Sequence, residues 1–148
     1  MYRNKMEELK KWKESSNRKP LIIRGARQVG KTWLMKEFGK EYYEKCAYIN
    51  FDDNTRMNKL FDEDFDLDTI IQGLKIESGV NIEPENTLIV LDEIQETPKA
   101  LKALKYFCEN AREYHIISAG SLLGVAIHGG TSFPVGKVDF LDLAPLSF

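Results

Sequence analysis

Residues 21–32 read Leu21-Ile22-Ile23-Arg24-Gly25-Ala26-Arg27-Gln28-Val29-Gly30-Lys31-Thr32. They contain the pattern G-x-x-x-x-G-K-[ST], which is typical of a phosphate-binding loop between a strand and a helix. The backbone of such a loop curls so that successive N–H groups and the helix N-terminus hold oxyanions. The residues expected to bind the phosphates are Gly25, Ala26, Arg27, Gln28, Val29, Gly30, Lys31, Thr32 and Trp33.

Two side chains of this loop have separate expected tasks. Lys31 is a candidate catalytic residue that would reach the β- and γ-phosphates as a point charge. The Thr32 hydroxyl is a candidate ligand of Mg²⁺, which keeps several waters in such sites. The sequence therefore predicts a site for magnesium and a nucleoside triphosphate.

A second part of the site, formed by acidic residues, is predicted after the apolar run Thr87-Leu88-Ile89-Val90-Leu91. An apolar run without alternation indicates a strand covered on both faces, as in a parallel sheet. Asp92 and Glu93 follow it directly, at the edge where such sheets bind ligands. We expect Asp92 to hold the Mg²⁺ shell and Glu93 to orient and deprotonate the attacking water. The alternative is an acidic helix N-cap after an ordinary buried strand.

A hydroxyl is expected at the end of a fourth strand, His115-Ile116-Ile117-Ser118-Ala119, which runs into Gly120-Ser121. Ser121 is the first candidate for contact with the γ-phosphate or the attacking water, and Ser118 is the second. Ser121 could equally cap a helix over 122–127. His115 is interpreted as a strand residue rather than a ligand.

The remaining pattern alternates helices and strands. The acidic turn Asp52-Asp53-Asn54 is interpreted as a cap of the next helix. The alternation predicts an α/β three-layer fold, with a mostly parallel five-stranded sheet and helices on both faces. The other predicted elements are helices over 4–14, 31–40, 67–78 and 98–112, a strand at 46–51, and a last strand around Val138, Phe140 and Leu141.

Composition is consistent with one ordinary globular domain. The chain has 148 residues, 43% of them hydrophobic and 30% charged, and a net charge of −2. This charge argues against a generally basic nucleic-acid surface, and no apolar run approaches the ~20 residues that span a bilayer. We expect a cytoplasmic protein with no membrane partner. Cys46 and Cys108 are expected to be buried small hydrophobes rather than a metal site or a disulfide.

Four segments together resemble the prokaryotic AAA-superfamily ATPases of the AAA_14 type. They are 18–32 with its Arg27-Gln28 insert, 91–95 (Leu91-Asp92-Glu93-Ile94-Gln95), 119–121 and 143–148 (Leu143-Ala144-Pro145-Leu146-Ser147-Phe148). The resemblance implies an ATP-binding core over 1–148, with Walker A at 25–32, Walker B at 88–93 and a sensor-like serine near 121. By analogy with the branch of phosphate-loop proteins that carries a glutamate after the Mg²⁺ aspartate, the strand order is expected to be 5-1-4-3-2. The family usually continues into a DUF4143 region, so we expect a core fragment that lacks its lid and C-terminal domain.

The leading functional hypothesis is an ATPase whose Mg²⁺-dependent hydrolysis of ATP to ADP drives a conformational change in an attached or partner domain. Because no arginine finger can be named, we expect low turnover from this chain alone. The first alternative is a nucleotide-gated binding module without significant hydrolysis. A kinase is a further alternative, although we find no Arg-rich lid segment. Nucleic-acid binding is supported only by the excess of basic residues among the N-terminal 19 residues.

Overall fold

The computed structural model describes residues 2–25, 30–62, 66–120 and 136–143, with side chains from residue 4 onward. The strands are β1 (Leu21–Arg24), β2 (Lys45–Asn50), β3 (Thr87–Asp92), β4 (His115–Gly120) and β5 (Asp139–Asp142). The helices are α1 (Tyr2–Glu14), α2 (Lys31–Tyr42), α3 (Thr55–Asp62), α4 (Leu67–Ser78) and α5 (Pro98–Asn110), with a short 3₁₀ helix η1 (Ile94–Glu96).

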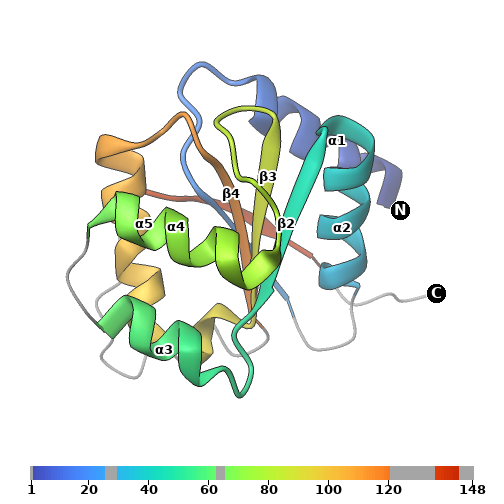
Figure 1. The fold of residues 1–148 in the computed structure, drawn as a ribbon. Coiled ribbons are helices and arrows are strands. Elements are labelled where there is room, and N and C mark those ends of the chain that lie inside the picture. Colours follow the sequence, from blue (N-terminus) through green and yellow to red (C-terminus); the bar gives the residue numbers. More distant parts are fainter. Residues whose placement is uncertain (1, 26–29, 63–65, 121–135, 144–148) are drawn as a thin grey trace.

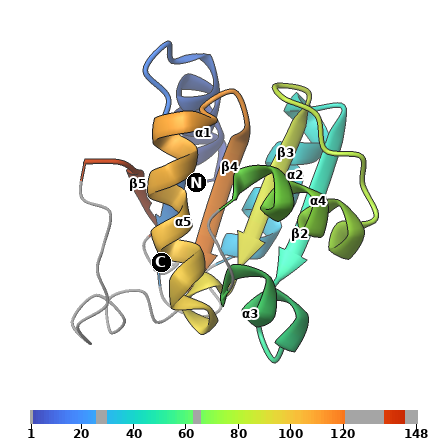
Figure 2. The ribbon, with the colours of Figure 1, turned by 60° about the vertical axis from the view of Figure 1, so that its left-hand side comes forward.

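The five strands form one sheet in the order β2-β3-β4-β1-β5. Each neighbouring pair is parallel, so the predicted order 5-1-4-3-2 is confirmed. Parallel neighbours bring all carboxyl ends of the strands to one edge of the sheet (Figure 2). That edge carries the ends of β1 and β3, where the phosphate loop and the acidic pair were predicted.

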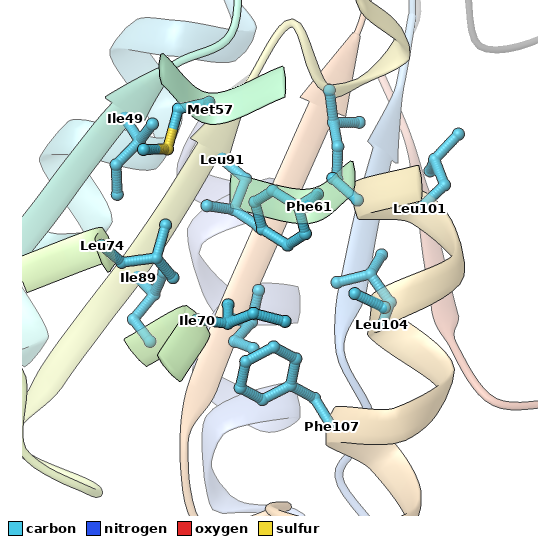
Figure 3. Close-up of a cluster of buried hydrophobic side chains, with 14 of the residues drawn as sticks. Ile49, Met57, Phe61, Ile70, Leu74, Ile89, Leu91, Leu101, Leu104 and Phe107 are labelled. Carbon is cyan, nitrogen blue, oxygen red and sulfur yellow. The ribbon is translucent and has the colours of Figure 1, made fainter. Parts of the chain in front are cut away.

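Helices cover both faces of the sheet, as predicted (Figure 1). Helices α1 and α2 pack on one face, through residues that include Leu9, Trp12, Leu34 and Phe38. Helices α3, α4 and α5 pack on the other. Figure 3 shows this second core, which includes Ile49, Met57, Phe61, Ile70, Leu74, Ile89, Leu91, Leu101, Leu104 and Phe107.

Strand alternation assigns each side chain to a face. Leu88 and Val90 of β3 lie in the core under α1 and α2, whereas Ile89 and Leu91 lie in the core under α3 to α5. By the same alternation Asp92 lies on the α2 face. The last residue of β3 is therefore on the side of the sheet to which the predicted phosphate-binding helix belongs.

Several predicted boundaries needed correction. Helix α2 runs to Tyr42 rather than residue 40, and β2 covers 45–50 rather than 46–51. Helix α5 stops at Asn110, two residues before the predicted end, because the backbone of Ala111 leaves the helical conformation with φ −147° and ψ 49°. The Arg112 side chain then donates through Nε to the Cys108 carbonyl in the last turn. Helix α3 and η1 had no predicted bounds, and the predicted helix at 122–127 lies outside the described residues.

The acidic turn does cap the following helix, but through an asparagine. Asn54 Oδ1 accepts the Met57 N–H at 3.1 Å, and its amide nitrogen donates to Glu77 Oε2 at 3.0 Å. Cys108 is buried as predicted, whereas Cys46 is only partly buried. Both are free thiols.

The opposite edge of the sheet holds His115. Its Nδ1 lies 2.6 Å from the Tyr43 hydroxyl, and only 4% of the residue is exposed. Burial, with the nearby cations Arg18 and Lys13, lowers the pKa of His115 to about 4. This histidine is therefore a neutral strand residue at pH 7, at the end of β4 far from Gly120.

Candidate functional site

The phosphate-loop segment begins where β1 ends and is closed by Gly30. Gly30 has φ 88° and ψ 19°, a left-handed conformation that favours glycine, and it caps α2 without a side-chain hydrogen bond. Its carbonyl accepts the Leu34 N–H at 3.0 Å. The first turn of α2 thus starts with backbone N–H groups that no cap side chain takes up. Residues 26–29 lie outside the described part of the chain.

Lys31 is buried, with 6% of its surface exposed. Its ammonium donates to the Gly25 carbonyl at 2.9 Å. The side chain therefore reaches back from α2 to the other end of the loop. A buried ammonium needs such oxygen partners, and phosphate oxygens would be stronger ones because the hydrogen bonds would then be charge-assisted on both sides.

Asp92 and Thr32 are in direct contact. Asp92 is 3% exposed, and its Oδ2 accepts the Thr32 hydroxyl at 2.6 Å. Because the hydroxyl hydrogen points at the carboxylate, the oxygen lone pairs of Thr32 are left for another partner. The structure thus brings together the two residues predicted to hold Mg²⁺, although β4 separates β1 from β3 in the sheet.

Sequence reasoning missed Tyr48, which completes the surroundings of Asp92. The Tyr48 hydroxyl donates to the same Oδ2 at 2.6 Å, while the Glu93 N–H donates to Oδ1 at 3.0 Å. Burial, together with the hydrogen bond to Asp92, raises the pKa of Tyr48, so its hydroxyl remains a donor. The Lys36 ammonium lies 4.1 Å from the centre of the Tyr48 ring. Tyr48 lies two residues before Asn50, which pairs with Asp92, so Tyr48 is on the same face of the sheet as Asp92. That relation could be found only once the register of the two strands was known.

Glu93 occupies the turn beyond β3 in a left-handed conformation, with φ 55° and ψ 42°. Its carboxylate accepts the Gln95 side-chain N–H at 2.8 Å. Gln95 is a second residue that the predictions missed as a contact. Its own carbonyl oxygen is buried without a hydrogen-bond partner among the described residues.

The serine candidates and Trp33 differ in position. Ser118 is fully buried, and within the described residues its hydroxyl has no hydrogen-bond partner. Strand alternation places it with Ile116 on the α3 to α5 face, away from Thr32 and Asp92. This position does not support Ser118 as a phosphate contact, and Ser121 lies outside the described residues. Trp33, on the first turn of α2, is 52% exposed.

The fold and these contacts define a P-loop nucleotide-binding domain of the ATPase class. The chain belongs to the AAA_14 family, since the family's model, described as an AAA domain, matches residues 17–148. A comparison with curated proteins gave no match.

Solved structures share the fold at low sequence identity. The Walker-type ATPase PABY2304 of Pyrococcus abyssi is 18% identical with a TM-score of 0.59, and the match covers 95% of this chain and 53% of that one. The RuvB Holliday junction branch migration motor of Thermotoga maritima is 14% identical with a TM-score of 0.59, covering 99% and 44%. The Orc1 protein of Aeropyrum pernix, solved in complex with DNA, is 14% identical with a TM-score of 0.57, covering 99% and 44%. The chain thus spans about half the length of these structures. Among its described residues, no helix has the length and apolar character to cross a membrane.

Proposed function

We propose that the chain binds ATP with Mg²⁺ and hydrolyses it to ADP, and that this cycle drives a conformational change in an attached or partner domain. The observation that carries the proposal is the 2.6 Å contact between Thr32 and Asp92. It joins the first turn of α2 to the end of β3, at the edge of the sheet where parallel α/β folds bind ligands.

The residues present fit a nucleotide and its cation. Lys31 would exchange its hydrogen bond to the Gly25 carbonyl for hydrogen bonds to phosphate oxygens. The Thr32 oxygen would bind Mg²⁺ while its hydroxyl group continues to donate its hydrogen bond to Asp92. Within the described residues no three His, Cys, Asp or Glu side chains gather into a metal site of their own. Oδ1 of Asp92, phosphate oxygens and water would supply the other ligands, since Mg²⁺ is usually bound by one or two carboxylates together with phosphates and waters.

Glu93 is the proposed general base. Its carboxylate lies one residue beyond Asp92, and Gln95 fixes one of its oxygens at 2.8 Å. Held in this way, the other oxygen can accept a proton from a water placed next to the terminal phosphate. The bound cation supplies electrostatic stabilisation of the transferred phosphoryl group.

The test separates binding from hydrolysis. Lys31→Ala is expected to weaken ATP and ADP binding by at least tenfold, because charge-assisted hydrogen bonds to phosphate are lost. Lys40→Ala, at an exposed position on the same helix, is the control and should bind as wild type does. Calorimetric titration with each nucleotide measures both. Equal affinity of wild type and Lys31→Ala would contradict the phosphate site.

Glu93→Gln tests hydrolysis. We expect it to abolish γ-phosphate release and to leave ATP affinity within about twofold, since the amide cannot take up a proton. Glu96→Gln, at an exposed position of η1, should retain the wild-type rate. If wild type releases no phosphate in a long single-turnover assay, alone or with its partner domain, the nucleotide-gated binding module is the better account.

We do not extend the proposal to nucleic acids. Two of the basic residues that suggested it are used inside the fold. The Lys13 ammonium lies 4.8 Å from the centre of the Tyr43 ring. Arg18 donates to the carbonyls of Lys13 and Arg112 at 3.2 and 3.0 Å.

A further inference from the structure

Within the described part of the chain, three hydrogen-bond donors surround the Asp92 carboxylate before any cation is considered. An ionised carboxylate offers about four acceptor positions, two on each oxygen. The hydroxyls of Thr32 and Tyr48 occupy both positions on Oδ2, each at 2.6 Å. The Glu93 N–H occupies one position on Oδ1 at 3.0 Å. As far as the described residues show, one acceptor position is left, and it belongs to Oδ1.

Tyr48 differs from the other two donors because the phosphate-loop pattern does not require it. Thr32 belongs to that pattern, and the Glu93 N–H is backbone. Tyr48 comes from β2, whose register with β3 pairs Tyr48 with Val90 and Asn50 with Asp92. Its ring lies against the Lys36 ammonium, 4.1 Å from the ring centre. The hydroxyl therefore reaches Asp92 from a fixed direction.

We propose that Tyr48 is a specificity-determining residue of the cation site: by occupying Oδ2 it limits Asp92 to a single contact through Oδ1, which favours Mg²⁺ over Ca²⁺. This inference rests on the proposed function of the site. Mg²⁺ demands near-ideal octahedral geometry and retains its waters, so a carboxylate with one open position suits it. Ca²⁺ takes more oxygen ligands and accepts bidentate carboxylates. Removing the Tyr48 hydroxyl opens a position on Oδ2 and removes this discrimination.

The experiment measures nucleotide affinity rather than turnover. ATP and ADP are titrated into wild type, Tyr48→Phe and Tyr48→Leu by calorimetry, with EDTA, Mg²⁺ or Ca²⁺ present. We expect the ratio of the affinity in Mg²⁺ to that in Ca²⁺ to fall by about tenfold in both variants, the scale of one hydrogen bond to a charged group. Affinity in EDTA should stay within about twofold of wild type.

Tyr43→Phe is the matched control. It also removes one tyrosine hydroxyl with a 2.6 Å partner, His115, but at the opposite edge of the sheet. Its ratio of Mg²⁺ to Ca²⁺ affinity should equal that of wild type. Thermal unfolding of each variant confirms that it is folded at the titration temperature.

The outcomes separate the two levels of the proposal. If wild type binds no nucleotide in any condition, the proposed function fails. If wild type prefers Mg²⁺ and both Tyr48 variants keep that preference, the function stands and the role of Tyr48 is refuted. A fall in one Tyr48 variant alone, or in Tyr43→Phe as well, points to altered packing and also refutes it.

Discussion

Glu93 is strained at the place where the proposed chemistry would occur. A left-handed backbone conformation costs a residue with a side chain roughly 1–2 kcal/mol, and Glu93 has φ 55°. Such strain persists where the surroundings fix the geometry. Here the Glu93 N–H is bound by Asp92 and its carboxylate by Gln95. This backbone conformation keeps the Glu93 side chain beside the end of β3.

The strain predicts that, at position 93, glycine is more stabilising than alanine, which is the reverse of the usual order. Glu93→Gly should be more stable than Glu93→Ala by about 1 kcal/mol, because glycine adopts positive φ without cost. The same pair at Glu96, which lies in η1 without positive φ, should show alanine equal to or more stable than glycine. Urea denaturation of the four variants measures the difference. If Glu93→Ala proves the more stable of its pair, Glu93 is not strained.

At the scale of the element, α2 is held close to the sheet by a glycine. A Cβ at Gly39 would lie 2.7 Å from Cys46 Sγ and 3.0 Å from Cys46 Cβ. Real side chains do not approach so closely. Gly39 therefore lets the helix that carries Lys31 and Thr32 lie directly against β2.

Gly39→Ala should be destabilising although alanine is the better helix former. The gain in helix propensity is about 1 kcal/mol, whereas overpacking against Cys46 costs about 1–3 kcal/mol, so we expect a net loss of about 1 kcal/mol. Gly73→Ala on α4 is the comparison, because its Cβ would meet the distal methyls of Leu60, 2.6 Å away, which can rotate. It should be neutral or stabilising. Chemical denaturation measures both, and a Gly39→Ala variant at least as stable as wild type would contradict the close packing.

Elements differ in how well the sequence predicted them. The strand order followed from analogy with the phosphate-loop proteins that carry a glutamate after the Mg²⁺ aspartate. The Thr32–Asp92 contact followed from an apolar run and a motif whose chemistry fixes its geometry. The cap of helix α3 was predicted, because the Asn54–Met57 hydrogen bond is local in sequence. The bounds of α3 were not predicted, since its acidic surroundings obscure helical spacing. The Tyr48 contact depends on strand register, and the backbone of Glu93 depends on tertiary hydrogen bonds. Neither of these is encoded in local periodicity.

At the scale of the whole molecule, the arginines whose side chains are described are bound elsewhere. Arg24 forms two hydrogen bonds with Asp142, and Arg56 forms two with Glu77. Arg112 donates to Cys108 and Asn17, close to Arg18 at the far edge of the sheet. The described arginines thus form their hydrogen bonds with groups other than Asp92 and Glu93. An arginine that stabilises the transition state contributes ~10³–10⁵ in rate.

The chain alone should therefore turn over ATP below about one per second even with saturating Mg²⁺, well under the median enzyme. Phosphate release measured over a wide range of protein concentrations tests this expectation and also locates the missing group. A low rate that is independent of concentration places the arginine in an attached or partner domain, whereas a rate per chain that rises with concentration indicates that a second copy supplies it. Turnover above one per second at the lowest concentration would contradict the prediction, because a single chain would then contain a complete catalytic set.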